Sequence, residues 1–268
     1  MVKSNGVNKG QEGMIGEVTR CIEEKALNAW PGLQQSVYDG WVLRFAHGYT
    51  RRSNSVIPLY RGEIDVERKI EKCEQSYGRK GMPSVFKMLP FAMPAGLDRI
   101  LDGTGYRREA ETSVQTCALA GLRATCKHRV LTWEWPAEPW LEIYAGFSGL
   151  SPEDRPFLFS ILGSIVPECR FVALVDDGEP VSCGIGICED GFLGIFSLVT
   201  AASERNRGFG RQLIGWLADW GKEMGAETAY LQVMVDNEPA RYLYASLGFR
   251  ELYRYWYRVK EIGLAISA

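Results

Sequence analysis

The sequence predicts an α/β (α+β) fold in two similar halves, and three observations lead to that prediction. Strand-like segments in residues 170–200 are separated by two Asp-Gly pairs, which favour the tight turns of an antiparallel meander. A strand, a glycine-containing loop and a helix follow in residues 192–224. Segments of residues 77–107 also recur in residues 220–250 at an offset of about 143 to 144, which indicates an ancient duplication.

Length and composition are those of a globular protein with room for two domains. The chain has 268 residues, 46% of them hydrophobic, and a formal net charge of −2. We expect the domains to span residues 1–130 and 131–268. A pI near 5.9 argues against a nucleic-acid partner bound mainly through phosphates. No apolar run reaches the roughly 18 residues of a membrane span, and residues 1–13 are polar and glycine-rich, unlike a signal peptide.

Cysteine and histidine usage bears on the compartment and the cofactor. Seven cysteines without a Cys-x-x-Cys pair suggest reduced thiols that pack as small hydrophobic side chains in a cytoplasmic protein. His47 and His128 are the only two histidines. A histidine-rich metal site is therefore not expected, and no metal is predicted.

The first half reads as a helix followed by strands and further helices. The expected elements are a helix over residues 14–30, strands over 37–46 and 53–60, a helix over 66–77 and a strand over 85–89. Pro31 ends the first helix. The two strands are expected to form a hairpin around a connection that contains a turn glycine. We interpret Arg51 and Arg52 as the solvated tip of this hairpin and His47 as a local hydrogen-bonding residue.

The second half reads as a connector, two helices and then strands. The expected elements are an extended connector over residues 131–140, helices over 140–147 and 152–165, and strands over 170–175, 180–188, 192–200 and 228–235. Ser151 is a possible N-cap of the second helix, with Pro152 at its first position. The strands from 170 to 200 turn at Asp177-Gly178 and Asp190-Gly191, which predicts one antiparallel meander.

The loop after the third of these strands has the composition of an anion site. It holds Arg205, Arg207, Gly208 and Gly210, and Arg211 follows. The next apolar residues recur at three and four positions, which predicts an amphipathic helix: Leu213, Leu217, Trp220 and Met224. The first amides of a helix lack acceptors and the helix dipole is positive there, so a phosphate would be favoured. We interpret the loop as a cradle for a diphosphate.

Two motifs in this half resemble those of a known family. The spacing Arg205-x-x-Gly208-x-Gly210 is neither the GxGxxG of dinucleotide folds nor a P-loop, which disfavours NAD and nucleoside triphosphates. It resembles the acyl-CoA motif Arg/Gln-x-x-Gly-x-Gly/Ala of the GNAT superfamily of N-acetyltransferases. A second GNAT-like motif is matched at Asn237, Ala240, Leu243, Tyr244, Gly248 and Phe249. The resemblance covers roughly residues 139 to 260.

This resemblance implies two GNAT-like halves, each a mixed, mostly antiparallel twisted sheet flanked by helices. It also implies an N-acetyltransferase that passes the acetyl group of acetyl-CoA directly to a primary amine of a small molecule or peptide. The backbone of Leu198, Val199 and Thr200 would hold the pantetheine arm, and Asn237 would hydrogen-bond it. The pyrophosphate would be bound by Arg205, Asn206, Arg207, Gly208, Phe209, Gly210 and Arg211. Tyr244 would protonate the leaving thiolate, unless it serves only in core packing.

The first half lacks the corresponding residues. Ile64 and Val66 stand where Gly208 and Gly210 are found in the second half, and Leu101 stands in the place of Tyr244. We therefore expect one acyl-CoA per chain, bound within residues 139–260.

Several alternatives follow from the same sequence. Some GNAT enzymes place a glutamate before the cradle as general base, but this strand has no carboxylate, so deprotonation would pass through water to Glu142, Asp176 or Glu189. A non-catalytic acyl-CoA-binding regulatory module is the alternative function, and the presence of Tyr244 together with the loop favours the enzyme. The acidic pI weakens an acceptor that is a nucleic acid or a ribosomal protein. We expect a monomer or homodimer without nucleic-acid or membrane partners.

Overall fold

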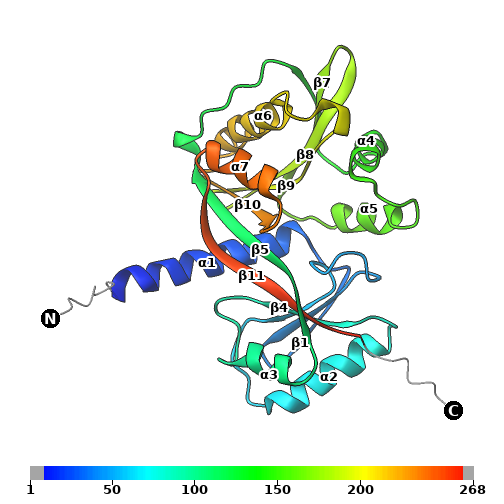
Figure 1. Cartoon of the computed structure of the whole chain (residues 1–268), viewed down its shortest axis with the longest axis vertical. Coiled ribbons are helices and arrows are strands. Elements are labelled where there is room, and N and C mark those ends of the chain that lie inside the picture. The colour runs from blue at the N-terminus through cyan, green and yellow to red at the C-terminus, as the bar shows by residue number, and fades with distance from the viewer. Residues whose placement is uncertain (1–8, 262–268) are drawn as a thin grey trace.

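The computed structural model describes the backbone of residues 9–261 and the side chains of residues 16–261. The described chain folds as two lobes that share one sheet (Figure 1). The first half forms α1 (Lys9–Ala29), β1 (Gln34–Tyr38), β2 (Trp41–Phe45), β3 (Val56–Pro58), α2 (Val66–Gly78), β4 (Ser84–Met88), α3 (Leu97–Gly103) and β5 (Arg107–Ala118). The second half forms β6 (Arg129–Trp133), α4 (Glu138–Ser148), α5 (Arg155–Gly163), β7 (Glu168–Asp176), β8 (Glu179–Glu189), β9 (Phe192–Thr200), α6 (Phe209–Glu223), β10 (Thr228–Met234), α7 (Glu238–Ser246) and β11 (Arg250–Lys260).

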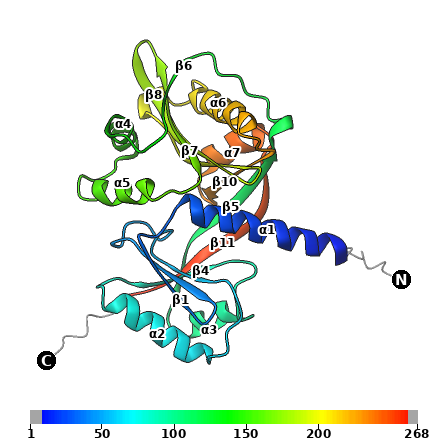
Figure 2. The ribbon, with the colours of Figure 1, turned by 180° about the vertical axis from the view of Figure 1, so that it is seen from behind.

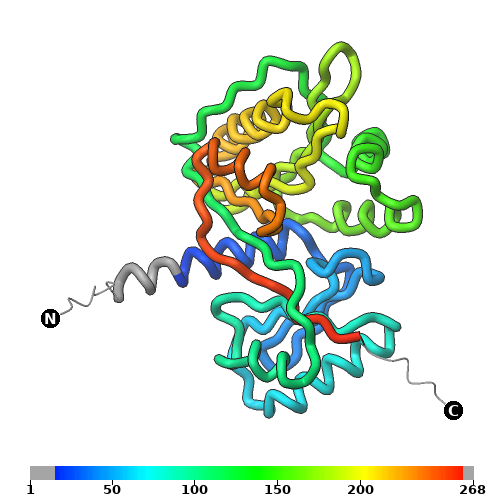
Figure 3. Tube along the Cα trace, viewed as in Figure 1, coloured from blue at the N-terminus to red at the C-terminus, as the bar shows by residue number. Residues whose placement is uncertain are grey.

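The two halves exchange their last strands. The strand order is β1-β2-β3-β4-β11-β5-β10-β9-β8-β7-β6, so β5 lies between β10 and β11, and β11 lies between β4 and β5. All of these central pairs are antiparallel. The long β5 and β11 run side by side through the junction of the lobes in Figure 3. The predicted fold class, a mixed and mostly antiparallel sheet flanked by helices, is confirmed.

The sequence of β11 explains its central place. Every second residue from 253 to 259 is buried: Tyr253, Tyr255, Tyr257 and Val259. Arg254 and Arg258 stand between them in the sequence. Behind this strand, Glu23 of α1 accepts hydrogen bonds from the Tyr253 hydroxyl, at 2.7 Å, and from the Lys87 ammonium of β4. Glu23 and Lys87 are both almost fully buried. The ion pair joins α1 to β4, and the Tyr253 hydrogen bond adds β11. Loss of either charged partner would leave a buried charge unpaired.

Helices cover both faces of the β7–β9 meander. Phe171 and Ala173 of β7 belong to the apolar cluster that includes α4 and α5, whereas Val172 and Leu174 belong to the cluster that includes α6 and α7. Because successive strand residues point to opposite faces, these helix pairs lie on opposite sides of the sheet. Helix α1 crosses the junction of the two lobes, as Figure 2 shows from behind. None of the described helices combines the length and apolar character needed to cross a bilayer.

The predicted meander is confirmed, and so is the helix expected over residues 66–77. Three other expectations were wrong. The strand expected over 37–46 is interrupted by a turn at Asp39-Gly40, where φ is 43° and 82°. The connector expected over 131–140 begins with an edge strand, β6, paired with β7. Helix α5 begins at Arg155 rather than Pro152, because the Ser151 hydroxyl accepts from the Asp154 amide at 3.1 Å and forms a turn before the helix.

The sheet opens between β9 and β10. These strands pair in parallel only over residues 192–195 and 228–231. Beyond that point β9 contains a bulge, in which Ser197 and Leu198 lie opposite Gly184 and Ser197 has φ 49°. The edge of β9 that faces β10 therefore pairs with no strand in residues 196–200 of the described chain. The opening leads to the first turn of α6.

Candidate functional site

The loop between β9 and α6 presents backbone amides at a helix start. Gly208 precedes α6 with φ +84°, a left-handed conformation that favours glycine. The Gln212 amide donates to the Gly208 carbonyl at 3.1 Å, which is the first hydrogen bond of the helix. The amides of residues 208–211 lie before this bond and at the positive end of the dipole of a 15-residue helix. The arrangement is suited to an anion.

The three arginines predicted to bind phosphate differ in their availability. Arg205 is exposed. Arg207 pairs with Asp176, at 3.0 Å, and with Glu204, so two carboxylates already offset its charge. Arg211 donates to the Ser246 hydroxyl and thereby links the first turn of α6 to α7. The backbone of the loop, rather than the Arg207 side chain, is the more available group for an anion.

The two predicted residues on or before α7 are both well defined. Asn237 caps the helix, because its Oδ1 accepts from the Ala240 amide at 3.2 Å, and its amide nitrogen is left to donate elsewhere. Tyr244 is 8% exposed and packs on Phe249 with ring centroids 6.0 Å apart. Burial raises the pKa of Tyr244 to about 12. The phenol is therefore protonated at neutral pH, and the residue also contributes to the core.

A cavity of about 380 Å³ lies where both halves meet beside the opening of the sheet. Its walls are mostly aromatic or hydroxyl-bearing and include two arginines; the lining residues are Trp30, Tyr49, Thr50, Arg51, Arg52, Ala110, Thr112, Tyr144, Ser197, Met234, Tyr255 and Tyr257. Ser197 and Met234 belong to β9 and β10, the strands that part at this point. The cavity therefore adjoins the unpaired edge of β9.

The hairpin loop of the first half forms one wall of this cavity. Arg51 is exposed, as expected for a solvated tip, but the same interpretation was wrong for Arg52. Arg51 and Arg52 both line the cavity. The Arg52 guanidinium lies 5.0 Å from the Trp30 ring centroid and 5.9 Å from that of Phe196, on β9 of the other half. His47 instead stacks on Phe157 of α5 with centroids 5.0 Å apart. The exchanged strands bring this loop against the second half, which no local pattern in the sequence indicated.

Tyr144 is a further residue that the sequence did not identify. It lies on α4, stacks on Trp140 at 5.2 Å between centroids, and lines the cavity beside Ser197. Burial raises the pKa of Tyr144, and the nearby Ser197 side chain acts against that effect. The aromatic spacing of α4 was visible in the sequence, but its partner strand was not.

The three carboxylates considered as bases do not line the cavity. Glu142 lies 3.6 Å from the Arg155 guanidinium on the outer side of α4. Asp176 pairs with Arg207, at 3.0 Å, and with His128, at 3.3 Å. Glu189, the last residue of β8, accepts a hydrogen bond from the Asn28 side chain at 2.8 Å. Among the described residues, no group of three or more His, Cys, Asp or Glu side chains is placed to hold a metal ion.

The comparisons with known proteins find similarity to acetyltransferases. The family model described as "Probable histone acetyltransferase Rv0428c C-terminal" matches residues 17–258. "Uncharacterized N-acetyltransferase YobR" of Bacillus subtilis (strain 168) is 31% identical over 249 residues, which is 90% of this chain and 98% of that protein. "Probable histone acetyltransferase Rv0428c" of Mycobacterium tuberculosis is 28% identical over 239 residues, 86% of this chain and 70% of that protein.

A solved structure shows the same fold. The GCN5-related N-acetyltransferase from Kribbella flavida superposes with a TM-score of 0.70 at 17% sequence identity. The match covers 92% of this chain and 97% of that chain. It therefore includes most of both halves.

Proposed function

This chain belongs to the acetyltransferase family of the Rv0428c C-terminal region, within the GNAT superfamily, and we propose that acetyl-CoA is its acetyl donor. The acceptor in this proposal is a primary amine of a small molecule or peptide, bound in the cavity between the halves. One observation carries the proposal. The loop amides of residues 208–211, the unpaired edge of β9 and the cavity lie in succession along the opening between β9 and β10.

The cofactor would follow this succession. Its pyrophosphate would accept hydrogen bonds from the amides at the start of α6, with Arg205 and Arg211 adding positive charge. Its pantetheine arm would lie along Leu198, Val199 and Thr200 like an added strand, where the backbone faces no strand of the described chain. Asn237 has an amide nitrogen free to donate to the arm from the α7 side. The thioester would then reach the bulge at Ser197, at the mouth of the cavity.

The transfer itself needs one nucleophile and two proton movements. The amine nitrogen attacks the thioester carbonyl carbon, the C–S bond breaks, and an N–C bond replaces it. The amine gives up a proton to water, since no carboxylate is found among the residues that line the cavity. The departing thiolate receives a proton, and the products are the N-acetylated acceptor and free CoA.

Tyr244 is the proposed donor of that proton. Its pKa, raised by burial to about 12, lies above the roughly 8.5 of a free thiol. The phenol is therefore fully protonated when the thiolate forms, although the transfer is uphill until the tyrosinate regains a proton from solvent. A positioned acid of this kind contributes about 10² to 10⁴ in rate.

A thiol-release assay tests the proposal. The protein is incubated with acetyl-CoA and a panel of amines, amino acids, aminoglycosides and lysine-containing peptides, and free CoA is measured. The relative from Mycobacterium tuberculosis is named for histone acetylation, so a histone-derived lysine peptide belongs in the panel. Acetyl-CoA binding without turnover on any acceptor would favour a regulatory acyl-CoA-binding module instead.

A further inference from the structure

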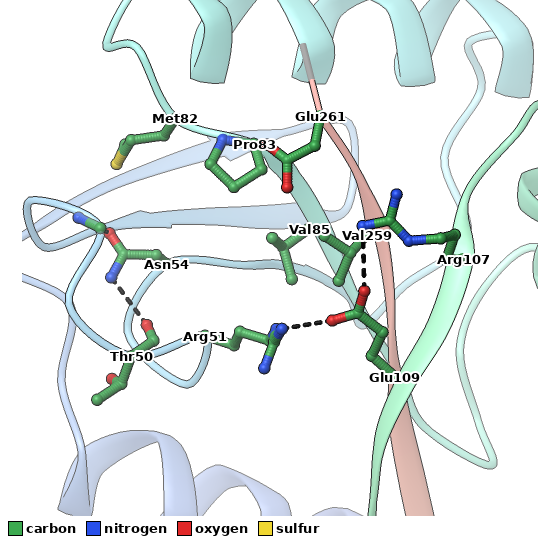
Figure 4. A pocket seen from close by; sticks show the side chains of 11 residues that line it. Thr50, Arg51, Asn54, Met82, Pro83, Val85, Arg107, Glu109, Val259 and Glu261 are labelled. Atoms are coloured by element: carbon green, nitrogen blue, oxygen red, sulfur yellow. Dashed lines mark hydrogen bonds and ion pairs between the residues drawn. The ribbon is translucent and has the colours of Figure 1, made fainter.

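The acceptor cavity carries positive charge and no negative charge in its lining. Its twelve lining residues include Arg51 and Arg52 and contain no aspartate or glutamate. Arg51 is paired: in the neighbouring pocket that Figure 4 shows, its guanidinium binds Glu109, which also contacts Arg107 at 3.3 Å. Arg52 makes no ion pair with any residue in the described range 16–261. One cation thus faces the cavity without a counter-charge.

The structure holds Arg52 in place before any ligand binds. The buried Asn54 accepts from the Ala46 amide at 2.6 Å and donates to the Tyr49 and Thr50 carbonyls at 2.7 and 2.8 Å, which closes the loop on itself. The buried Arg44 donates to the Arg52 carbonyl at 3.1 Å. The Arg52 guanidinium also lies over Trp30. With its backbone fixed and its guanidinium packed on an aromatic ring, the Arg52 side chain loses little conformational freedom when it binds a partner.

Backbone conformation points to the same cavity. Thr50, Ala110 and Ser197 have φ of 59°, 54° and 49°, and all three line it from three different elements. Non-glycine residues rarely adopt these angles, and such positions cluster at binding sites. The three bends come from the hairpin loop, β5 and β9, so the cavity is shaped by both halves together.

We infer that the acceptor amine also carries an oxyanion, a carboxylate or a phosphate, which the Arg52 guanidinium binds. This inference rests on the proposed function. The planar guanidinium presents paired N–H groups that match two oxygens of such a group. The aromatic walls, chiefly Trp30, Tyr49 and Tyr144, suit an apolar or aromatic body between the oxyanion and the amine. The acceptor class is therefore an apolar amino acid or its phosphonate counterpart, rather than a lysine-rich peptide, whose charge Arg52 would repel.

Matched acceptors test the inference. Phenylalanine, phenylalaninamide and the aminophosphonate analogue of phenylalanine share one amine and one body but differ in the oxyanion. The same three forms of leucine and methionine extend the series, and a lysine-rich peptide completes it. We expect kcat/KM for the best oxyanion form to exceed that of its amide by roughly tenfold to hundredfold, the range of a charge-assisted hydrogen-bond pair. The carboxylate and phosphonate arms decide which oxyanion is preferred.

Variants assign the effect to one arginine. Arg52→Gln should reduce the ratio of oxyanion to amide toward one, mainly through KM, whereas Arg51→Gln should retain most of the ratio because Glu109 already offsets that charge. The inference is overturned if amides or the basic peptide are the better acceptors, if no oxyanion form is acetylated, or if Arg52→Gln leaves the ratio unchanged. Calorimetry with acetyl-CoA distinguishes failure of this inference from failure of the proposed function. A wild-type protein that does not bind acetyl-CoA contradicts the proposed function itself.

Discussion

The helix starts of α2 and α6 occupy equivalent places in the two halves and differ in what fills them. Before α2, the Asp39 carboxylate accepts from the Glu63 and Ile64 amides, each at 3.0 Å, and pairs with Lys69 at 3.0 Å. These two amides hold the pKa of Asp39 below its usual range. Before α6, the corresponding loop ends in Gly208, and the amides that follow precede the first helical hydrogen bond.

The difference shows how one fold can use amides before a helix to bind a carboxylate of its own chain. In the first half a carboxylate of the β1–β2 turn binds the two amides just before the N-cap of α2. That N-cap is Asp65, so Asp65, and not Ile64 as the sequence suggested, stands in the place of Gly208. A second anion would meet both the Asp39 and Asp65 charges. The first half therefore provides its own anion, and in the proposed binding mode only the second half takes one from a cofactor.

The largest effect is expected from a charge placed in the second-half loop. Gly208→Glu should weaken acetyl-CoA binding by at least about a hundredfold, because a carboxylate would stand where the phosphates belong. Titration calorimetry measures this. Ile64→Glu, next to the matching N-cap Asp65 of the first half, should leave the affinity unchanged.

Backbone strain is separated from charge by a third variant. Gly208 has φ +84°, so glutamate there is strained as well as charged. Asparagine tolerates this conformation, and Gly208→Asn should retain binding within about tenfold. Equal loss with Asn and with Glu would mean that strain, not phosphate repulsion, explains the result.

A smaller effect, on the reaction rate, is expected at Tyr244. The first half has Leu101 in the place of this tyrosine. Tyr244→Phe should reduce kcat by at least about tenfold while acetyl-CoA affinity stays within a few fold, the signature of an interaction used mainly in the transition state. Steady-state kinetics and calorimetry on the same preparation test this. Wild-type turnover, or loss of the folded state, would leave Tyr244 as a packing residue beside Phe249.

The comparison also predicts a binding stoichiometry. Calorimetry or native mass spectrometry should give one acetyl-CoA per chain, because the Asp39 carboxylate already binds the two amides that precede the N-cap of α2. A value of two would show that a phosphate can displace that carboxylate and that the two helix starts are alike in function.

The smallest effect is expected from Asp39→Asn, which removes the built-in charge but keeps one acceptor. It should lower the melting temperature modestly and leave the stoichiometry at one. Because the folded-state pKa of Asp39 is depressed, its contribution is present above the unfolded-state pKa of about 3.9 and is lost as pH falls. The difference in melting temperature between wild type and variant should therefore be largest near neutral pH and should disappear below about pH 4. A constant difference across that range would contradict this role.

Local patterns predicted much of the second half. The Asp-Gly turns, the apolar stripe of α6 and the two motifs were each contained in a short stretch of chain. The strands β5 and β11 were not predicted. In β5 the sequence around Thr112 to Gln115 is polar, and its partners come from the other half. In β11 the alternation of Tyr253, Tyr255 and Tyr257 was a usable strand signal, yet it gave no indication of the neighbour.

The acceptor cavity could not be predicted for the same reason. Its lining runs from Trp30 to Tyr257, and the exchanged strands are what bring these residues together. Arg52 looked like a hairpin residue because its contacts, Trp30 and Phe196, are distant in sequence. The proposed cofactor loop lies in one short stretch of sequence and could be predicted, whereas the proposed acceptor site is assembled from distant residues and could not.

The strand exchange makes the two halves one thermodynamic unit. If residues 107–118 were withdrawn, β10 and β11 would each lose a neighbour at the centre of the sheet, and withdrawing residues 250–260 would do the same to β4 and β5. Two copies of a single half that swapped their last strands would build the same arrangement of central strands with true twofold symmetry. The chain thus has the geometry of a domain-swapped dimer whose subunits have been covalently fused, and residues 119–128 are the fusion link. In such a molecule the first half is a permanently attached subunit that supplies a wall of the cavity it shares with the second half.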